Sequence, residues 1–146
     1  MNICTVTQAT MGEVVPLFNA YREFYGQPSD LKQAEQFIKA RVEKEQSIIF
    51  LAYHEKEPVG FAQLFPIFSS VAMKKAFILN DLFVAGHARN GGVATALIEQ
   101  CYAYCQQENA RYMMLETAKT NVNAQKLYEK VGMTRDDHVY YYSVYW

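Results

Sequence analysis

The stretch 79–100, LNDLFVAGHARNGGVATALIEQ, restricts the fold of this chain more than any other part of its sequence. An apolar run at 75–84 predicts a strand, and apolar residues recurring at helical spacing over 93–108 predict a helix directly after it. The segment RYMMLET at 111–117 predicts a further strand. A strand, a helix and a strand in this order predict a β-α-β unit, whose strands are parallel and whose crossover is right-handed.

The rest of the sequence predicts a mixed sheet covered by helices. Further strands are expected at 3–9, 47–54, 59–68 and 139–146, and further helices at 11–25, 31–45 and 121–132. Thr10 with Glu13 predicts a capping box for the first helix, and Pro66 predicts a strand edge or a bulge. We therefore expect one domain over 1–146 of the α/β (α+β) class, with a mixed, mostly antiparallel sheet, one parallel β-α-β unit and helices on both faces.

The composition is that of a folded globular protein, with 51% apolar and 20% charged residues in a chain of 146. The formal net charge of −1 gives no electrostatic signal for a nucleic acid or an anionic membrane. No run approaches the roughly 20 apolar residues that a membrane-spanning helix needs. The N-terminal segment MNICTVTQAT lacks the basic and apolar regions of a secretion signal, so we expect a cytoplasmic protein.

The three cysteines are Cys4, Cys101 and Cys105. Their odd number fits a reducing compartment. Cys101 and Cys105 lie four residues apart with no second pair and no nearby histidine. This spacing favours burial on one face of a helix over a metal site, and we expect no metal.

Three glycines lie where the predicted helix after 75–84 begins, at Gly86, Gly91 and Gly92. The dinucleotide pattern G-x-G-x-x-G is absent. Gly86 and Gly91 have P-loop spacing, but Gly-Val follows where that loop needs lysine and then serine or threonine. What remains, Arg89-x-x-Gly92-x-Ala94 at a helix N-terminus, suits a pyrophosphate held by free backbone amides. The alternative is a tight turn that only precedes a helix.

Two patterns together resemble the GNAT superfamily of acyl-CoA-dependent N-acetyltransferases. Its signature Arg/Gln-x-x-Gly-x-Gly/Ala appears after a strand, at 89–94, as RNGGVA. A second family pattern, Asn-x-x-Ala-x-x-Leu-Tyr followed by Gly-Phe, appears at 121–133 as NVNAQKLYEKVGM, with Met133 in the place of phenylalanine. The resemblance covers the chain from about residue 47 to its end, and the two early helices fit the family's layout.

The resemblance implies acetyl-CoA as the cosubstrate. The backbone groups that would pair with its pantetheine arm belong to Leu82, Phe83 and Val84. The amides that would hold its pyrophosphate belong to Arg89, Asn90, Gly91, Gly92, Val93, Ala94 and Thr95. Asn121 would contact the pantetheine, and Tyr128 would lie near the thioester sulfur, where its phenol would be the general acid for the departing thiolate. Otherwise, Tyr128 is a core tyrosine of an amphipathic helix.

The resemblance does not supply the base that deprotonates the amine. The strand LNDLFV resembles that of diamine acetyltransferases, which carry a glutamate where this chain has Asn80, and asparagine cannot accept a proton. Asp81 is therefore the candidate base, with Glu116 on the neighbouring strand or an ordered water as alternatives. The other interpretation of Asp81 is a surface residue that caps or pairs. We expect direct transfer in a ternary complex, without a covalent acyl-enzyme.

The resemblance implies that the first two helices and the loop that connects them shape the acceptor side. The side chains expected to line its pocket are those of Tyr21, Arg22, Tyr25, Asn80 and Tyr141. An aromatic wall near the acidic Glu23 and Asp30 would suit a cationic amine. The alternative is that these aromatic residues belong to the core and the sheet.

The resemblance therefore implies an N-acetyltransferase that moves acetyl from acetyl-CoA to a primary amine, polyamine-like or amino-acid-like. A protein lysine or N-terminal acetyltransferase is one alternative, and a non-catalytic acyl-CoA-binding sensor is another. No nucleic-acid or membrane partner is expected. The dense aromatic segment 139–146 favours a homodimer, because strand edges and aromatic surfaces often mediate pairing.

Overall fold

The computed structural model describes all residues 1–146, and the chain divides into two compact units, Met1–Glu116 and Thr117–Trp146. Each unit has its own internal contacts. The expectation of one domain over 1–146 stays a prediction.

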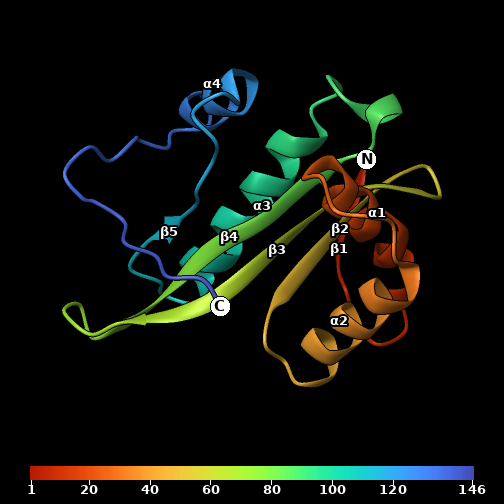
Figure 1. The fold of residues 1–146 in the computed structure, drawn as a ribbon, viewed down its shortest axis with the longest axis horizontal. Helices are drawn as coiled ribbons and strands as arrows, with labels where there is room; N and C mark the ends of the chain where they lie inside the picture. Colours follow the sequence, from red (N-terminus) through yellow and green to blue (C-terminus); the bar gives the residue numbers. More distant parts are fainter. The chain divides into compact units, whose positions relative to one another are not determined.

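The first unit is built on a five-stranded mixed sheet (Figure 1). Its strands, in spatial order, are β1 (Asn2–Thr5), β2 (Ile48–His54), β3 (Glu57–Ser69), β4 (Lys74–Val84) and β5 (Met113–Met114). Neighbours from β1 to β4 are antiparallel, whereas β4 and β5 are parallel. The mixed, mostly antiparallel sheet and its parallel β-α-β unit are thus confirmed, although β5 is much shorter than the predicted strand 111–117.

Helices cover both faces of this sheet, as expected. The helices α1 (Met11–Phe24) and α2 (Leu31–Glu43) pack on one face, where the ring of Phe18 meets that of Phe61 edge to face. The helix α3 (Val93–Gln107) packs on the other, where the ring of Tyr104 lies 5.5 Å from that of Phe77. None of the helices combines the length and the apolar character that a membrane crossing requires.

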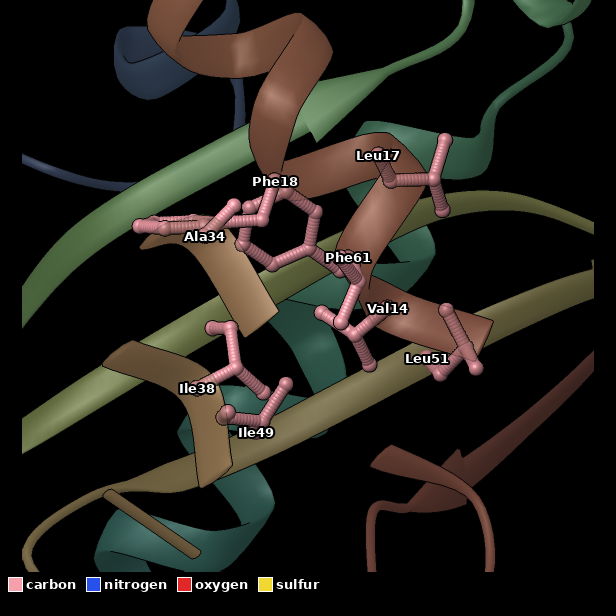
Figure 2. Packing of buried hydrophobic residues seen from close by; sticks show 9 residues of the cluster. Val14, Leu17, Phe18, Ala34, Ile38, Ile49, Leu51 and Phe61 are labelled. Carbon is pink, nitrogen blue, oxygen red and sulfur yellow. The ribbon is translucent and has the colours of Figure 1, made fainter. Parts of the chain in front are cut away.

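One hydrophobic core lies between α1, α2 and the sheet (Figure 2). Its fully buried members include Val14, Ile38, Leu51 and Phe61. On the α3 face, Gly60 leaves room for the helix, since a Cβ there would lie 3.1 Å from Val93. Burial of each large apolar side chain favours folding by about 1.5–3 kcal/mol, so the helices are fixed to the sheet mainly by these contacts.

The ends of α1 and α2 are fixed differently. Asp30 caps α2, because its carboxylate accepts a hydrogen bond of 3.0 Å from the amide of Gln33. The capping box expected at α1 is wrong: Thr10 stands at the N-cap but its side chain makes no cap hydrogen bond. Its hydroxyl instead accepts from the Thr7 amide, and Glu13 accepts from the Tyr53 hydroxyl.

A bulge interrupts the pairing of β3 with β4. Gln63 lies opposite Asp81 and Leu64 lies opposite Leu79, so Asn80 has no partner across the ladder. Beyond Leu64, β3 no longer pairs with β2. Pro66 lies in this part, where its missing N–H costs no ladder bond, and the expectation of a strand edge there is confirmed.

The second unit contains one helix, α4 (Val122–Lys130). Asn121 is its N-cap, accepting from the Ala124 amide, and Gly132 follows its end with a positive φ of 93°, both as expected. The expected strand at 139–146 is wrong, because none of these residues lies in a strand. The reason is physical: a strand needs a partner, and residues 117–146 contain no other strand.

Candidate functional site

One edge of β4 is open over half of its length. β4 pairs with β3 along its whole length except at Asn80, but with β5 only at Phe77 and Ile78. The Ala85 amide donates to the Val59 carbonyl of β3, and backbone groups alternate along a strand. The backbones of Leu82 and Val84 therefore point to the open edge, while that of Phe83 points to β3. An extended ligand can add to this edge as a further strand would.

The loop after β4 leaves a row of amides without acceptors. A short 3₁₀ helix, Gly86–Ala88, leads to Asn90 and Gly92, which have positive φ angles of 64° and 82°. The first amide of the following turn to find an acceptor is that of Ala96, which donates to Gly92. The amides from Asn90 to Thr95 donate to no group of this unit, and Gly92 offers α3 no side-chain cap. Free amides at a positive helix end fit a pyrophosphate.

Arg89 joins this loop to the strand. Its Nε donates a hydrogen bond of 3.0 Å to the carbonyl of Val84, which faces the open edge. Its guanidinium carbon lies 5.7 Å from the ring centres of both Phe24 and Phe83. These contacts hold a positive charge beside the free amides and orient the loop.

A cavity of about 310 Å³ lies where α1 and α2 meet β3 and β4. The residues that line it are Phe18, Tyr21, Arg22, Gln33, Ala34, Phe37, Gln63, Asn80 and Asp81. Its size is at the lower end of the range for small-molecule sites, and it combines apolar walls with few polar groups.

Asp81 is buried in this cavity wall, with only 2% of its surface exposed. Gln63 donates to one carboxylate oxygen, and Asn80 donates to the other over 2.7 Å. Burial raises the pKa of Asp81 above its ordinary value, although hydrogen bonds from Asn80, Gln63 and Tyr21 oppose the shift. The interpretation of Asp81 as a surface residue is therefore wrong.

Gln63 is a site residue that the sequence patterns did not identify. It is fully buried, and its oxygen accepts a hydrogen bond of 2.7 Å from the hydroxyl of Ser47 while its nitrogen donates to Asp81. It is the one polar side chain in the apolar run VGFAQLFPIF at 59–68. A buried polar group needs hydrogen-bond partners, so a single glutamine in an apolar strand is the sequence signal that could have identified this residue.

Three of the five expected acceptor residues meet at the cavity. Tyr21, Arg22 and Asn80 line it, and the Tyr21 hydroxyl donates to the Asn80 carbonyl over 3.1 Å. Tyr25 is 58% exposed and lies outside the lining, although its ring contacts that of Tyr21. Tyr141 lies in the second unit and is 63% exposed.

The remaining expected residues are placed as follows. Asn121 and Tyr128 belong to the second unit, at the N-cap and within α4, and both are half-buried. Cys101 and Cys105 are buried on α3, as their spacing predicted. Glu116 is exposed and lies beyond β5, and Glu23 and Asp30 lie outside the cavity lining.

Known proteins resemble this chain over nearly its whole length. Residues 14–133 match the model of the acetyltransferase (GNAT) family. The chain is 44% identical, over 97% of its length and 95% of the relative, to an uncharacterized N-acetyltransferase, YhfO, of Bacillus subtilis (strain 168). It is 36% identical to a probable acetyltransferase of known crystal structure, with a TM-score of 0.94 over 99% of this chain and 97% of the other. The aminoglycoside N-acetyltransferase AAC(6')-Iy, crystallised with CoA, shares the fold at 20% identity, with a TM-score of 0.79 over 98% of this chain and 93% of the other.

The raised pKa of Asp81 predicts a particular dependence of stability on pH. The folded protein holds the Asp81 proton more tightly than the unfolded chain, in which the pKa of this carboxyl is near 3.8. The free energy of unfolding should therefore fall as the pH rises from the unfolded pKa through the raised folded pKa. Asp81→Asn should remove this fall, as measured by urea unfolding at a series of pH values.

Asp137→Asn is the matched control, because Asp137 is an exposed aspartate in the second unit. Its stability profile should run parallel to that of the unmodified protein. Parallel profiles for Asp81→Asn as well would contradict the assignment of a raised pKa to this carboxyl.

Proposed function

Because the chain belongs to the GNAT family of acetyltransferases, we propose that it transfers the acetyl group of acetyl-CoA to the primary amine of a small acceptor, polyamine-like or amino-acid-like. The observation that carries this proposal is the meeting, around β4, of an open strand edge, a row of free amides and a cavity that ends on Asp81.

The free amides and the open edge support acetyl-CoA as the cosubstrate. The amides from Asn90 to Thr95 would hold its pyrophosphate, and the backbones of Leu82 and Val84 would pair with its pantetheine arm. Bound there, the cosubstrate supplies an activated acetyl thioester. The shared fold of an acetyltransferase crystallised with CoA supports this proposal too. Asn121 would add a contact to the pantetheine.

Asp81 is the proposed base. An alkylammonium ion has a pKa of about 10 and must lose a proton before its nitrogen can attack. Asp81 lines the acceptor cavity, and its raised pKa makes it a better proton acceptor than an ordinary carboxylate. Its two hydrogen-bonded oxygens fix the orientation of the carboxylate, and an ordered water is the alternative carrier of the proton.

The proposed transfer is direct. The neutral amine nitrogen attacks the thioester carbonyl carbon, and a backbone amide at the open edge of β4 stabilises the oxyanion. The carbon–sulfur bond then breaks and the phenol of Tyr128 protonates the departing thiolate. The nitrogen passes its remaining extra proton to the resulting phenolate, which leaves a neutral amide and restores the phenol. No acyl-enzyme forms, so incubation with acetyl-CoA alone leaves the protein unacetylated.

The small size of the cavity favours a small acceptor over a protein lysine or N-terminus. A half-open cavity of about 310 Å³ has room for one small molecule, whereas a peptide needs an extended groove. A non-catalytic acyl-CoA-binding sensor remains the second candidate, since it would use the same amides. Acceptor-dependent turnover of acetyl-CoA distinguishes the transferase from the sensor.

We further propose a cytoplasmic homodimer that pairs through the aromatic segment 139–146. Several aromatic side chains of this segment are almost fully exposed, including Tyr142 at 94% and Trp146 at 102%. Such a surface on a monomer is an aggregation risk unless a partner covers it. A second copy of the chain would supply both the strand partner and the cover.

Tyr128→Phe should lower kcat for acceptor-dependent release of free thiol from acetyl-CoA by about 100-fold or more, because the general acid is lost. The KM for acetyl-CoA should change little. Tyr112→Phe is the matched control, since Tyr112 is partly exposed and lies outside the proposed machinery. An unchanged kcat in Tyr128→Phe would exclude Tyr128 as the general acid. If acetyl-CoA released no free thiol with any acceptor, the result would favour the sensor.

The dimer predicts a light-scattering mass of twice the chain mass at micromolar concentration. The double change Tyr142→Lys and Tyr145→Lys should halve that mass, because two charges would enter the covered surface. Tyr112→Lys, which changes an exposed tyrosine that is not part of this segment, should leave the mass unchanged. A single-chain mass for the unmodified protein would refute the dimer.

A further inference from the structure

One donor atom of a charged group in the cavity wall has no hydrogen-bond partner. The Nη1 atom of Arg22 is buried and makes no hydrogen bond. Leaving such a donor unpaired is unfavourable, more so for a charged group, and native proteins rarely retain one without a use. No ion pair joins Arg22 to Asp81, although both residues line the same cavity.

The polar groups of the cavity are divided by the elements that carry them. The sheet side carries the carboxylate of Asp81, held by Gln63 and Asn80. The helix side carries the donors, Arg22 on α1 and Gln33 on α2. The cavity therefore offers an acceptor of protons on one wall and donors to an anion on the other.

Apolar side chains complete the wall between these polar groups. Phe18 of α1 and Phe37 of α2 stack with ring centres 5.5 Å apart, and Ala34 leaves space beside them. Such a surface fits the apolar part of a small ligand.

We propose that the acceptor is an amine that also carries a carboxylate, in the class of the amino acids, and that Arg22 binds this carboxylate. The inference rests on the proposed function, because it takes the cavity to be the acceptor site. A guanidinium presents two parallel N–H groups to a carboxylate, and the Gln33 side-chain amide can donate to the same group. The ammonium end lies toward Asp81.

The same charges disfavour the polyamine alternative. A polyamine that placed one amine near Asp81 would bring its second positive charge toward the guanidinium of Arg22, whose Nη1 atom has no hydrogen-bond partner. Like charges in a partly buried site repel strongly. In an amino acid the charges of the α-ammonium and α-carboxylate groups cancel, and this pair matches a cavity that holds one carboxylate and one guanidinium.

The test compares each amino acid with the amine that remains when its carboxyl group is removed, such as phenylalanine with phenethylamine and lysine with cadaverine. Free-thiol release from acetyl-CoA gives kcat/KM for each, and calorimetry gives binding to the protein. The carboxylate should improve kcat/KM by about 10- to 100-fold, as expected for a hydrogen bond to a charged group.

Arg22→Gln should bring this ratio close to one, mainly through KM, and Arg22→Lys should restore part of it. Arg111→Gln, which removes an exposed arginine outside the cavity, should keep the full ratio. Circular dichroism checks that each variant is folded.

Amines without a carboxylate that react as well as the amino acids would overturn the carboxylate proposal and leave the transferase intact. Thiol release from no acceptor would overturn the proposed function instead. In that case the calorimetry decides on Arg22: amino-acid binding that is lost in Arg22→Gln supports the carboxylate site, and no binding to the unmodified protein refutes it.

Discussion

The open edge of β4 is the feature on which the rest of the site depends. β5 accompanies β4 for only two residue pairs, so the backbone groups of Leu82 and Val84 have no strand beside them in the first unit. Polar backbone groups require partners, and an extended ligand can supply them. The same strand leads directly into the loop whose amides face outward at the start of α3. The short pairing of these two strands thus creates both halves of the proposed cosubstrate site.

The bulge opposite Gln63 positions the proposed base, Asp81, on the strand that carries that edge. It leaves Asn80 without a cross-strand partner and sets Asp81 opposite Gln63. Asp81 and Gln63 are both buried in an otherwise apolar layer, where a carboxylate is unfavourable unless it is hydrogen-bonded. The helices α1 and α2 pack around this polar group without filling the space above it, and the cavity is the result. Burial makes the ionised carboxyl of Asp81 unfavourable, and for the same reason it makes this carboxyl a better proton acceptor.

Local sequence patterns predicted most helices and strands, but they could not predict the pairing between residues that are distant in the sequence. The glycines at 86, 91 and 92 and the apolar spacing of α3 identify the strand, loop and helix, since these depend on neighbouring residues. The bulge, the burial of Asp81 and the unpaired Nη1 of Arg22 depend on contacts across the fold. The segment 139–146 has strong strand propensity but forms no strand, because propensity cannot replace a partner.

Hydrogen exchange with and without CoA tests the cosubstrate site most directly. In the free protein the amides from Asn90 to Thr95 have no acceptor and should exchange quickly. Saturating CoA should slow these amides, and also those of Leu82 and Val84 at the open edge of β4. Unchanged exchange at Asn90–Thr95, with CoA binding established by calorimetry, would show that the cosubstrate lies elsewhere and would contradict the account.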